Sequence, residues 1–452
     1  MKDLHHSCQG ESHIATNKVC QDASYSATDT TMSIAIVCDG HGGARYFRSD
    51  VGAKFAVDAT KECVDEFVSE IDKGIFVGKS FTQKKSVSSE AQSNILSKDT
   101  TTDKALRQLF SSIIFKWREK IVRHALETPL TIEEESSIES KFKEDFIKGV
   151  GVEKTYGCTL MCFVYTEQFW FAFHIGDGKC IAFNEDGSWH EPIPWDEKCF
   201  LNKTTSLCDS SAIDEFRYCY CGDGTFPLAV FLGSDGIDDS FGETKNMVNF
   251  YIQVLKLINK EGHDNALANI KDTLPQLSKI GSKDDMSLSC IYDDGALAYK
   301  IKYLISWQRH NVEQSLFDVN NRILKLKEEI KCLVNSDLRN QKSMINYQYA
   351  QKDLTKAFDL KKTLANKWNK FSEELVGDSF RHYTDEIGFG EMQSPENLET
   401  HNVPDNSTLT EEVDSISLDE TAADYSMEKT SANCCPAEDD KNTETSNGKS
   451  EK

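Results

Sequence analysis

The chain has 452 residues, with 74 acidic and 51 basic side chains and a formal net charge of −23. This length predicts two or three folding units. The charge argues against a general binder of nucleic acids or anionic membranes, because their phosphates attract basic surfaces. It does not exclude binding a phosphate group through metal ions, which add positive charge that the composition does not count.

The sequence also indicates a cellular compartment. No apolar run approaches the ~20 residues of a transmembrane helix, and residues 1–18 lack the apolar core of a signal peptide. The fifteen cysteines are an odd number, and no two have the CxxC spacing of a zinc site. We therefore expect a cytoplasmic protein with reduced thiols and no zinc.

Apolar runs rich in β-branched and aromatic residues predict strands in the first 298 residues. These runs are residues 31–38, 157–166, 169–175, 180–184, 228–232 and 286–292. We expect the strand at 180–184 to pair back on 169–175 as a hairpin through the Gly-Asp-Gly turn between them. Helical spacing covers residues 52–70 and 247–259. Strands grouped in hairpins, with helices set apart, predict an α+β layered fold rather than a parallel βαβ sheet.

An insertion of about residues 71–148 interrupts this domain. Residues 71–101 are rich in Ser, Thr and Lys and predict a loop. Residues 103–127 predict an amphipathic helix that begins at Asp103 and ends before Pro129.

From residue 303 the apolar period changes to alternating steps of four and three, which is a heptad pattern. Two such seams, separated by a polar break near residues 335–337, predict an antiparallel helical hairpin at 299–380. It either packs on the main domain and on itself, or serves as an arm for self-association or a protein partner in its 303–375 region. Residues 385–452 are rich in acidic and small polar residues and predict a disordered tail.

Aspartates placed just after apolar runs are the feature that suggests chemistry. They are Asp22, Asp39, Asp177, Asp235 with Asp239, and Asp284 with Asp285. A single Asp-Gly is ordinary turn chemistry, but a carboxylate at the end of a buried strand costs desolvation energy unless it meets a cation or donors. Stacked sheets bring five such sites together. Carboxylates without a Cys/His cluster favour Mg²⁺ or Mn²⁺, and a pair of such ions suits hydrolysis of a phosphate ester.

The motifs then identify a family. Residues 39–43 (Asp-Gly-His-Gly-Gly) resemble the hallmark of the metal-dependent Ser/Thr protein phosphatases of type 2C, the PPM family. The resemblance continues in order through Gly157-Cys158-Thr159, Gly176-Asp177-Gly178, Ser234-Asp235-Gly236 and residues 284–287, and it covers about residues 7–294. The opening at Gly10–His13 resembles a bacterial branch.

The resemblance implies a four-layer αββα sandwich of two antiparallel sheets flanked by helices. It implies a protein serine/threonine phosphatase with two Mn²⁺ or Mg²⁺ ions, in which a hydroxide bridging the ions attacks the phosphorus of phosphoserine or phosphothreonine directly. Asp39 would bridge both ions, and Gly40 would bind through its carbonyl oxygen. Asp235 and Asp284 would hold one ion, with Asp22 in support through water. Asp177 and Asp239 match a third, weaker site, and His41 matches the general acid.

Several positions depart from the family pattern. Asn17 stands where many members have an arginine that clamps the substrate phosphate, and Gln21 replaces an acidic residue. Asp285 replaces an asparagine, and Gly178 replaces a serine. We expect His13 or Lys18 to assist phosphate binding instead, although His13 can equally be a surface or capping residue.

Two alternatives to an active enzyme remain at this point. The missing arginine and the altered final motif allow a catalytically impaired phosphatase-like scaffold or regulatory binding protein, although the principal carboxylates are present. The helical arm and acidic tail allow an assembly module.

Overall fold

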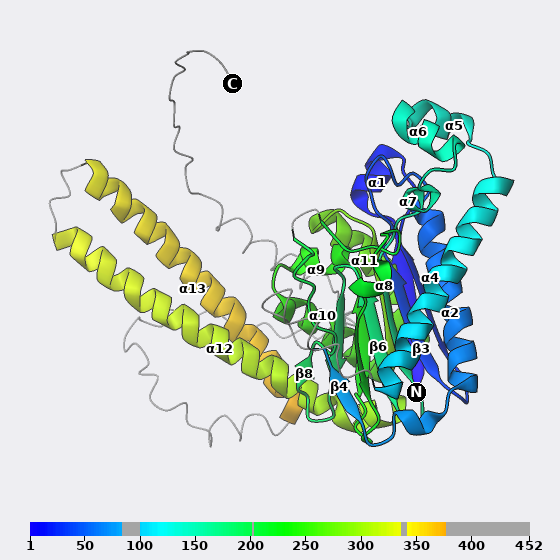
Figure 1. The fold of residues 1–452 in the computed structure, drawn as a ribbon. Helices are drawn as coiled ribbons and strands as arrows, with labels where there is room; N and C mark the ends of the chain where they lie inside the picture. The colour runs from blue at the N-terminus through cyan, green and yellow to red at the C-terminus, as the bar shows by residue number, and fades with distance from the viewer. Residues whose placement is uncertain (84–99, 201–202, 336–340, 377–452) are drawn as a thin grey trace, which may run out of the picture.

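The computed structural model describes residues 1–83, 100–200, 203–335 and 341–376. Two antiparallel sheets stack face to face, and helices cover both outer faces (Figure 1). This four-layer arrangement confirms the predicted α+β sandwich. The predicted tail at 385–452 and part of the predicted loop (84–99) lie outside the described residues.

The first sheet has the strand order β1-β11-β10-β7-β8. Its strands are β1 (Lys2–Cys8), β11 (Met286–Tyr292), β10 (Ala229–Gly233), β7 (Lys179–Phe183) and β8 (Trp189–His190). Its outer face packs on α10 (Thr244–Glu261), α11 (His263–Ile280) and the first turns of α12 (Asp294–Asn335). The short helix α9 (Asp235–Phe241) follows β10 directly.

The second sheet has the order β2-β3-β5-β6-β9-β4. Its strands are β2 (Ala23–Thr28), β3 (Ser33–Cys38), β5 (Leu160–Tyr165), β6 (Trp170–Ile175), β9 (Arg217–Cys221) and β4 (Ser80–Thr82). Alternate residues of β3 explain its continuous apolar sequence: Ile34 and Ile36 face the helices α2 (Ser49–Glu70) and α4 (Thr101–Glu127), whereas Ala35 and Val37 face the other sheet. Both faces of the strand are therefore buried.

The predicted hairpin around Asp177 is wrong. β6 pairs with β5 and β9, whereas β7 lies in the other sheet and pairs with β10 and β8. Gly176 has φ +130°, a conformation that glycine adopts without strain, and a Cβ on Gly178 would approach the carbonyl oxygen of Gly233 to 2.7 Å. The turn therefore carries the chain from one sheet to the other and leaves Asp177 between them.

The insertion contains more helix than the sequence predicts. Thr100, not Asp103, caps α4, and Asp103 completes a capping box with it. After α4 come two short helices, α5 (Ile132–Ser137) and α6 (Ser140–Ile147), and then α7 (Val152–Thr155). Figure 1 shows α5, α6 and α7 at the same end of the sandwich as α1 (Glu11–Thr16). The remaining short elements are the 3₁₀ helix η1 (Lys73–Ile75) and α8 (Ala212–Glu215).

The C-terminal arm is an antiparallel pair of long helices, α12 and α13 (Gln341–Val376), as predicted. Its base packs on the domain, where Lys256 of α10 forms an ion pair with Glu374 and Gln308 donates to the carbonyl of Asn249. Farther out, Val319, Ile323 and Ala357 form a small core between the two helices. No helix in the described ranges is both long and apolar enough to span a membrane.

Candidate metal centre

The register of the two sheets brings the predicted aspartates to one end of the sandwich. Asp22 precedes β2 and Asp39 follows β3, and their neighbours Ala23 and Cys38 are paired. In the other sheet, Gly233 at the end of β10 pairs with Lys179 and Leu288, so Asp177, Asp235 and Asp284 belong to this end too. Residues from five separate chain segments therefore meet because their strands start or stop at the same level.

The carboxylates act on one another across the two sheets. Burial raises the pKa of Asp39 well above its ordinary value, and the charges of Asp235 and Asp22 raise it further. The side chains of Asp39 and Asp235 lie close enough to interact, so two like charges repel there unless a cation or a proton lies between them. Burial, with Asp285 and Asp235, likewise raises the pKa of Asp22.

The remaining aspartates extend this group. Burial, then the charge of Asp235, raises the pKa of Asp177 to about 6, and a hydrogen bond from Thr204 opposes this change. Burial and Asp235 also raise the pKa of Asp284. Asp239 is exposed and adds to the negative field at Asp177. All six side chains of the predicted set are thus electrostatically linked through Asp235 or its neighbour Asp177.

Divalent cations fit these residues. Among the described residues, Asp22, Asp39 and Asp235 have no Lys or Arg partner, and the buried atoms Asp22 Oδ2 and Asp235 Oδ1 have no hydrogen bond. Oxygen-only donors suit Mg²⁺ or Mn²⁺. In the described part of the chain, no group of three or more His, Cys, Asp or Glu side chains is already arranged to hold a metal ion. The group has the charge and the free oxygen atoms for cations.

The Asp39–Gly43 loop is held tightly. Asp39 exchanges two hydrogen bonds with Thr159, from its own N–H to Thr159 Oγ1 (3.0 Å) and from the Thr159 N–H to its carbonyl (2.8 Å). A Cβ on Gly40 would approach the carbonyl of Gln21 to 2.4 Å and the backbone of Ser49 to 3.0 Å, so only glycine fits there. The Gly-Cys-Thr motif thus supports the Asp-Gly motif directly.

His41 lies beside this loop with its ring fixed. Its Nε2 lies 2.7 Å from Ser206 Oγ, and its backbone N–H donates to the carbonyl of Gly157. Burial lowers the pKa of His41 to about 4, an effect that Asp209 and Asp235 oppose and Lys154 supports. Ser206 and Asp209 were not predicted from the sequence, since they belong to no motif and lie far from His41 in the chain.

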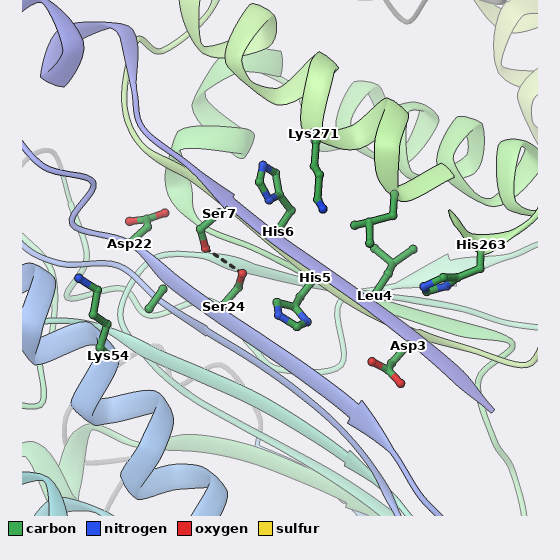
Figure 2. A pocket seen from close by; sticks show the side chains of 12 residues that line it. Asp3, Leu4, His5, His6, Ser7, Asp22, Ser24, Lys54, His263 and Lys271 are labelled. Atoms are coloured by element: carbon green, nitrogen blue, oxygen red, sulfur yellow. Dashed lines mark hydrogen bonds between the residues drawn. The ribbon is translucent and has the colours of Figure 1, made fainter. Parts of the chain in front are cut away.

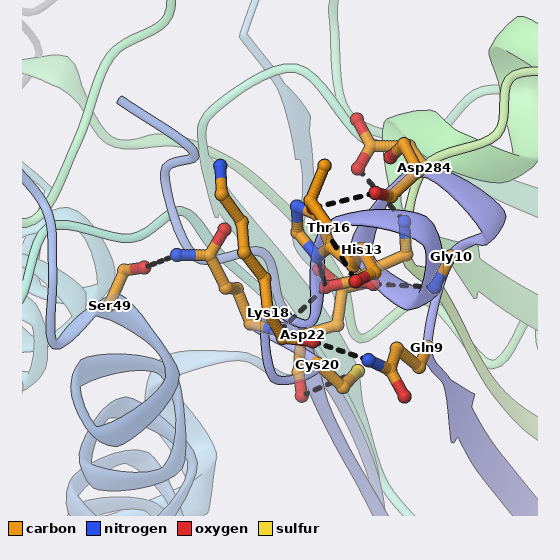
Figure 3. Close-up of polar contacts among 12 residues, drawn as sticks. Gln9, Gly10, His13, Thr16, Lys18, Cys20, Asp22, Ser49 and Asp284 are labelled. Carbon is orange, nitrogen blue, oxygen red and sulfur yellow. Dashed lines mark hydrogen bonds and ion pairs between the residues drawn. The ribbon is translucent and has the colours of Figure 1, made fainter. Parts of the chain in front are cut away.

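The N-terminal residues around α1 form a second polar cluster (Figure 3). Asp285 is 3% exposed and accepts hydrogen bonds from the N–H groups of Gly10 and Gln21, each at 2.6 Å. It also accepts from His13 Nδ1 at 2.9 Å. His13 is therefore buried against Asp285, and this contact stabilises the region around α1. The asparagine-to-aspartate departure at 285 places a carboxylate against the His13 ring.

Lys18 and Asn17 occupy the turn after α1. Lys18 is exposed and, within the described ranges, its ammonium group forms no ion pair. Asn17 ends α1 in the left-handed conformation (φ 60°, ψ 28°), which asparagine tolerates better than most residues. The residue at the usual position of the phosphate-clamping arginine thus serves as a helix cap.

A groove of about 540 Å³ runs along the edge of the sandwich where β1 and β2 lie side by side (Figure 2). It is lined by His5, His6, His263, Lys54 and Lys271, and Asp22 stands at its boundary with the metal centre. Lys54 is paired with Asp50, and burial lowers the pKa of both His5 and His6. The groove therefore carries little net positive charge, and it shares Asp22 with the converging carboxylates.

Comparison with known proteins identifies the family. The sequence profile described as Protein phosphatase 2C matches residues 9–272, more than half of the chain. The chain belongs to the protein phosphatase 2C family. This confirms the resemblance found in the motifs and the enzyme class that it implies, a protein-serine/threonine phosphatase. A search of curated protein sequences found no match.

Solved structures resembling the phosphatase have low sequence identity to it. A bacterial serine phosphatase is 16% identical, with TM-score 0.37, covering 65% of this chain and 99% of its own. PppA, described as a regulatory component of the type VI secretion system of Pseudomonas aeruginosa, is 17% identical, with TM-score 0.37 and coverage of 64% and 96%. The catalytic domain of PstP, solved with two manganese ions, is 12% identical, with TM-score 0.35 and coverage of 65% and 98%.

Proposed function

We propose that this phosphatase removes phosphate from phosphoserine and phosphothreonine in proteins, with Mn²⁺ or Mg²⁺ as its cofactor. The observation that carries this proposal is the group of buried carboxylates at one end of the sandwich, which the chain itself leaves without a cationic partner. Burying like charges without compensation costs several kcal/mol of stability. A fold retains them where a ligand of opposite charge completes the site.

We assign Asp39, the Gly40 carbonyl, Asp235 and Asp284 to two divalent ions, with Asp22 in support. Asp177 and Asp239 are assigned to a weaker third position. When bound, such ions lower the pKa of water for attack on phosphorus and offset the charge of the phosphoryl oxygens. The side chains fix where this happens, since Asp39 and Asp235 come from opposite sheets and their contact spans the sandwich.

Two further residues are assigned to the substrate. His41 is the candidate donor of a proton to the departing serine or threonine oxygen, since an alkoxide leaves poorly without one. Ser206 holds its ring in place. Lys18, which is exposed next to α1, is the better candidate than His13 for contact with the substrate phosphate, because His13 is occupied by Asp285.

The test is hydrolysis of a phosphoserine peptide and of p-nitrophenyl phosphate by the full chain, with and without Mn²⁺. We expect metal-dependent turnover in wild type and none in Asp39→Asn or Asp235→Asn. Absence of metal-dependent turnover in wild type contradicts the enzyme and favours the scaffold alternative. Equal turnover in the variants contradicts the site assignment.

A second role is favoured for the arm. Phe317, Leu324 and Tyr349 are large apolar side chains that stay exposed on α12 and α13 beyond the region that packs on the domain. Such exposure on a projecting hairpin is typical of a partner-binding or self-association surface. Sedimentation of wild type against a Phe317→Ser, Leu324→Ser variant tests self-association. An unchanged monomer mass for wild type would contradict it.

We further assign the activity to the cytoplasm. The thirteen cysteines within the described ranges are free thiols, and most are buried in the sandwich. Reduced cysteines are typical of that compartment.

A further inference from the structure

The α5–α6 lobe (residues 132–147) lies directly against the loop that follows the Asp-Gly-His-Gly-Gly motif. Phe142 of α6 lies under the Arg45 guanidinium, 5.9 Å from the centre of its ring. Phe146 packs edge-on against Phe47, with ring centres 5.6 Å apart, and also contacts Arg48. The residues that the lobe contacts therefore follow His41 by no more than seven positions in the chain.

One buried arginine fastens the lobe. Arg48 is 3% exposed, and all five of its N–H groups have acceptors. Nε and Nη2 donate to the two carboxylate oxygens of Glu134 in α5, at 2.7 and 2.9 Å. The remaining donors reach the carbonyls of Thr128 and Pro129 and the hydroxyl of Tyr156, at 3.0 to 3.1 Å. Tyr156 precedes Gly157, whose carbonyl binds the His41 N–H.

The lobe has almost no core of its own. Within it Ile138 is the single buried residue. The lobe is held on the domain by the contacts of Glu134 with Arg48 and of Phe146 with Phe47. Its outer surface nevertheless exposes Ile132 (84%) and Ile147 (66%), and Val150 (58%) follows on the segment that returns to Lys154. Three large, exposed apolar side chains on so small an element are typical of an interaction surface. Residues 132–147 contain six acidic side chains against two lysines, and Glu133, Glu139 and Lys141 among them are exposed.

We infer that this lobe is a docking surface for the protein substrate, and that it selects phosphorylated segments carrying apolar and basic side chains near the phosphorylated residue. The inference rests on the proposed function. The protein substrate is the expected partner because the lobe contacts the loop that carries His41. A basic segment is favoured because an acidic surface repels acidic segments. Seven extended residues span about 23 Å, and the lobe contacts Phe47 and Arg48, which follow His41 by six and seven residues.

The test uses two 15-residue phosphoserine peptides that differ only in two positions, isoleucine in one and serine in the other, both with flanking arginines. We expect wild type to favour the isoleucine peptide in kcat/KM by roughly tenfold. Ile132→Ser with Ile147→Ser should abolish that preference through KM. Phe115→Ser removes an equally exposed side chain (72%) from the middle of α4 and is the matched control, which should keep the preference.

The outcomes separate this inference from the proposed function. No preference in wild type, or a preference that survives in the double variant, overturns the docking surface while leaving the phosphatase intact. Absence of Mn²⁺-dependent turnover of both peptides and of p-nitrophenyl phosphate overturns the proposed function itself.

Discussion

The carboxylates at the end of the sandwich and the Arg48–Glu134 pair beneath the lobe are both charges withdrawn from water. Every N–H of Arg48 has an acceptor, and Glu134 receives both arms of the guanidinium. At the metal centre, by contrast, Asp39 and Asp235 are two like groups close to one another, and Asp235 Oδ1 has no partner among the described residues. A buried charge with partners in the chain stabilises the fold, whereas a buried charge without such partners indicates a ligand-binding site.

The largest expected effect comes from Asp39→Asn. It should lower metal-dependent turnover by more than about 100-fold, since loss of an outer-shell partner alone costs 10- to 100-fold. In metal-free buffer the same change should raise the melting temperature, because it removes a buried negative charge. Asp58→Asn on the exposed face of α2 is the control and should do neither. A fall in melting temperature for Asp39→Asn would show that the Asp39 carboxylate does not destabilise the metal-free fold.

Removing Arg48 should lower the stability of the fold, whereas Asp39→Asn should raise it. Arg48→Met leaves Glu134 and three other acceptors without their donor, and we expect a loss of about 3–5 kcal/mol in the free energy of unfolding. Urea denaturation measures it. Arg107→Met breaks an exposed ion pair with Asp214 and should cost no more than about 1 kcal/mol. Equal costs for the two arginines would show that the lobe is not fastened as described.

The Arg48–Glu134 pair also predicts a pH dependence. Burial opposes ionisation of Glu134, but hydrogen bonds from Arg48 and from the Thr131 N–H outweigh it and hold the pKa of Glu134 below its ordinary value of 4.5. Its stabilising effect is therefore complete above that value and is lost as the pH falls through the lowered pKa. Wild type should be more stable than Glu134→Gln at pH 7, and the two should converge in acid. A constant difference would contradict this.

The smallest effect is expected for the outer arm. Replacing residues 314–362 by a short Gly/Ser linker keeps the base of α12 and α13, including Gln308 and Glu374, on α10. Turnover of p-nitrophenyl phosphate should change by less than about twofold, because changes away from buried features usually have small effects. A larger loss would mean that the arm contributes to the metal centre.

The sequence predicted the parts of this molecule that depend on local pattern. Strands such as β3 and β11 are continuous apolar runs, and the aspartates follow them at motif spacing. β1 escaped prediction because His5 and His6 interrupt its apolar pattern at an edge of the sheet. The change of sheet at Gly176–Gly178 escaped because a hairpin and a crossover use the same turn residues.

The sequence predicted the carboxylates of the candidate site but not the residues that hydrogen-bond to its histidines. Asp22, Asp39 and Asp235 carry motif signals, and the register brings them together. The contacts of Ser206 with His41 and of Asp285 with His13 join residues more than 160 positions apart, and no local pattern indicates them. The same holds for Arg48, whose partners Thr128, Pro129 and Glu134 belong to the insertion and whose partner Tyr156 follows it.

The central claim is that the converging carboxylates bind divalent cations, and calorimetric titration of Mn²⁺ into the metal-free full chain tests it most directly. We predict two ions bound to wild type and to Asp58→Asn, and loss of that binding in Asp39→Asn. Identical titrations of wild type and Asp39→Asn, or no binding to wild type, would contradict the claim.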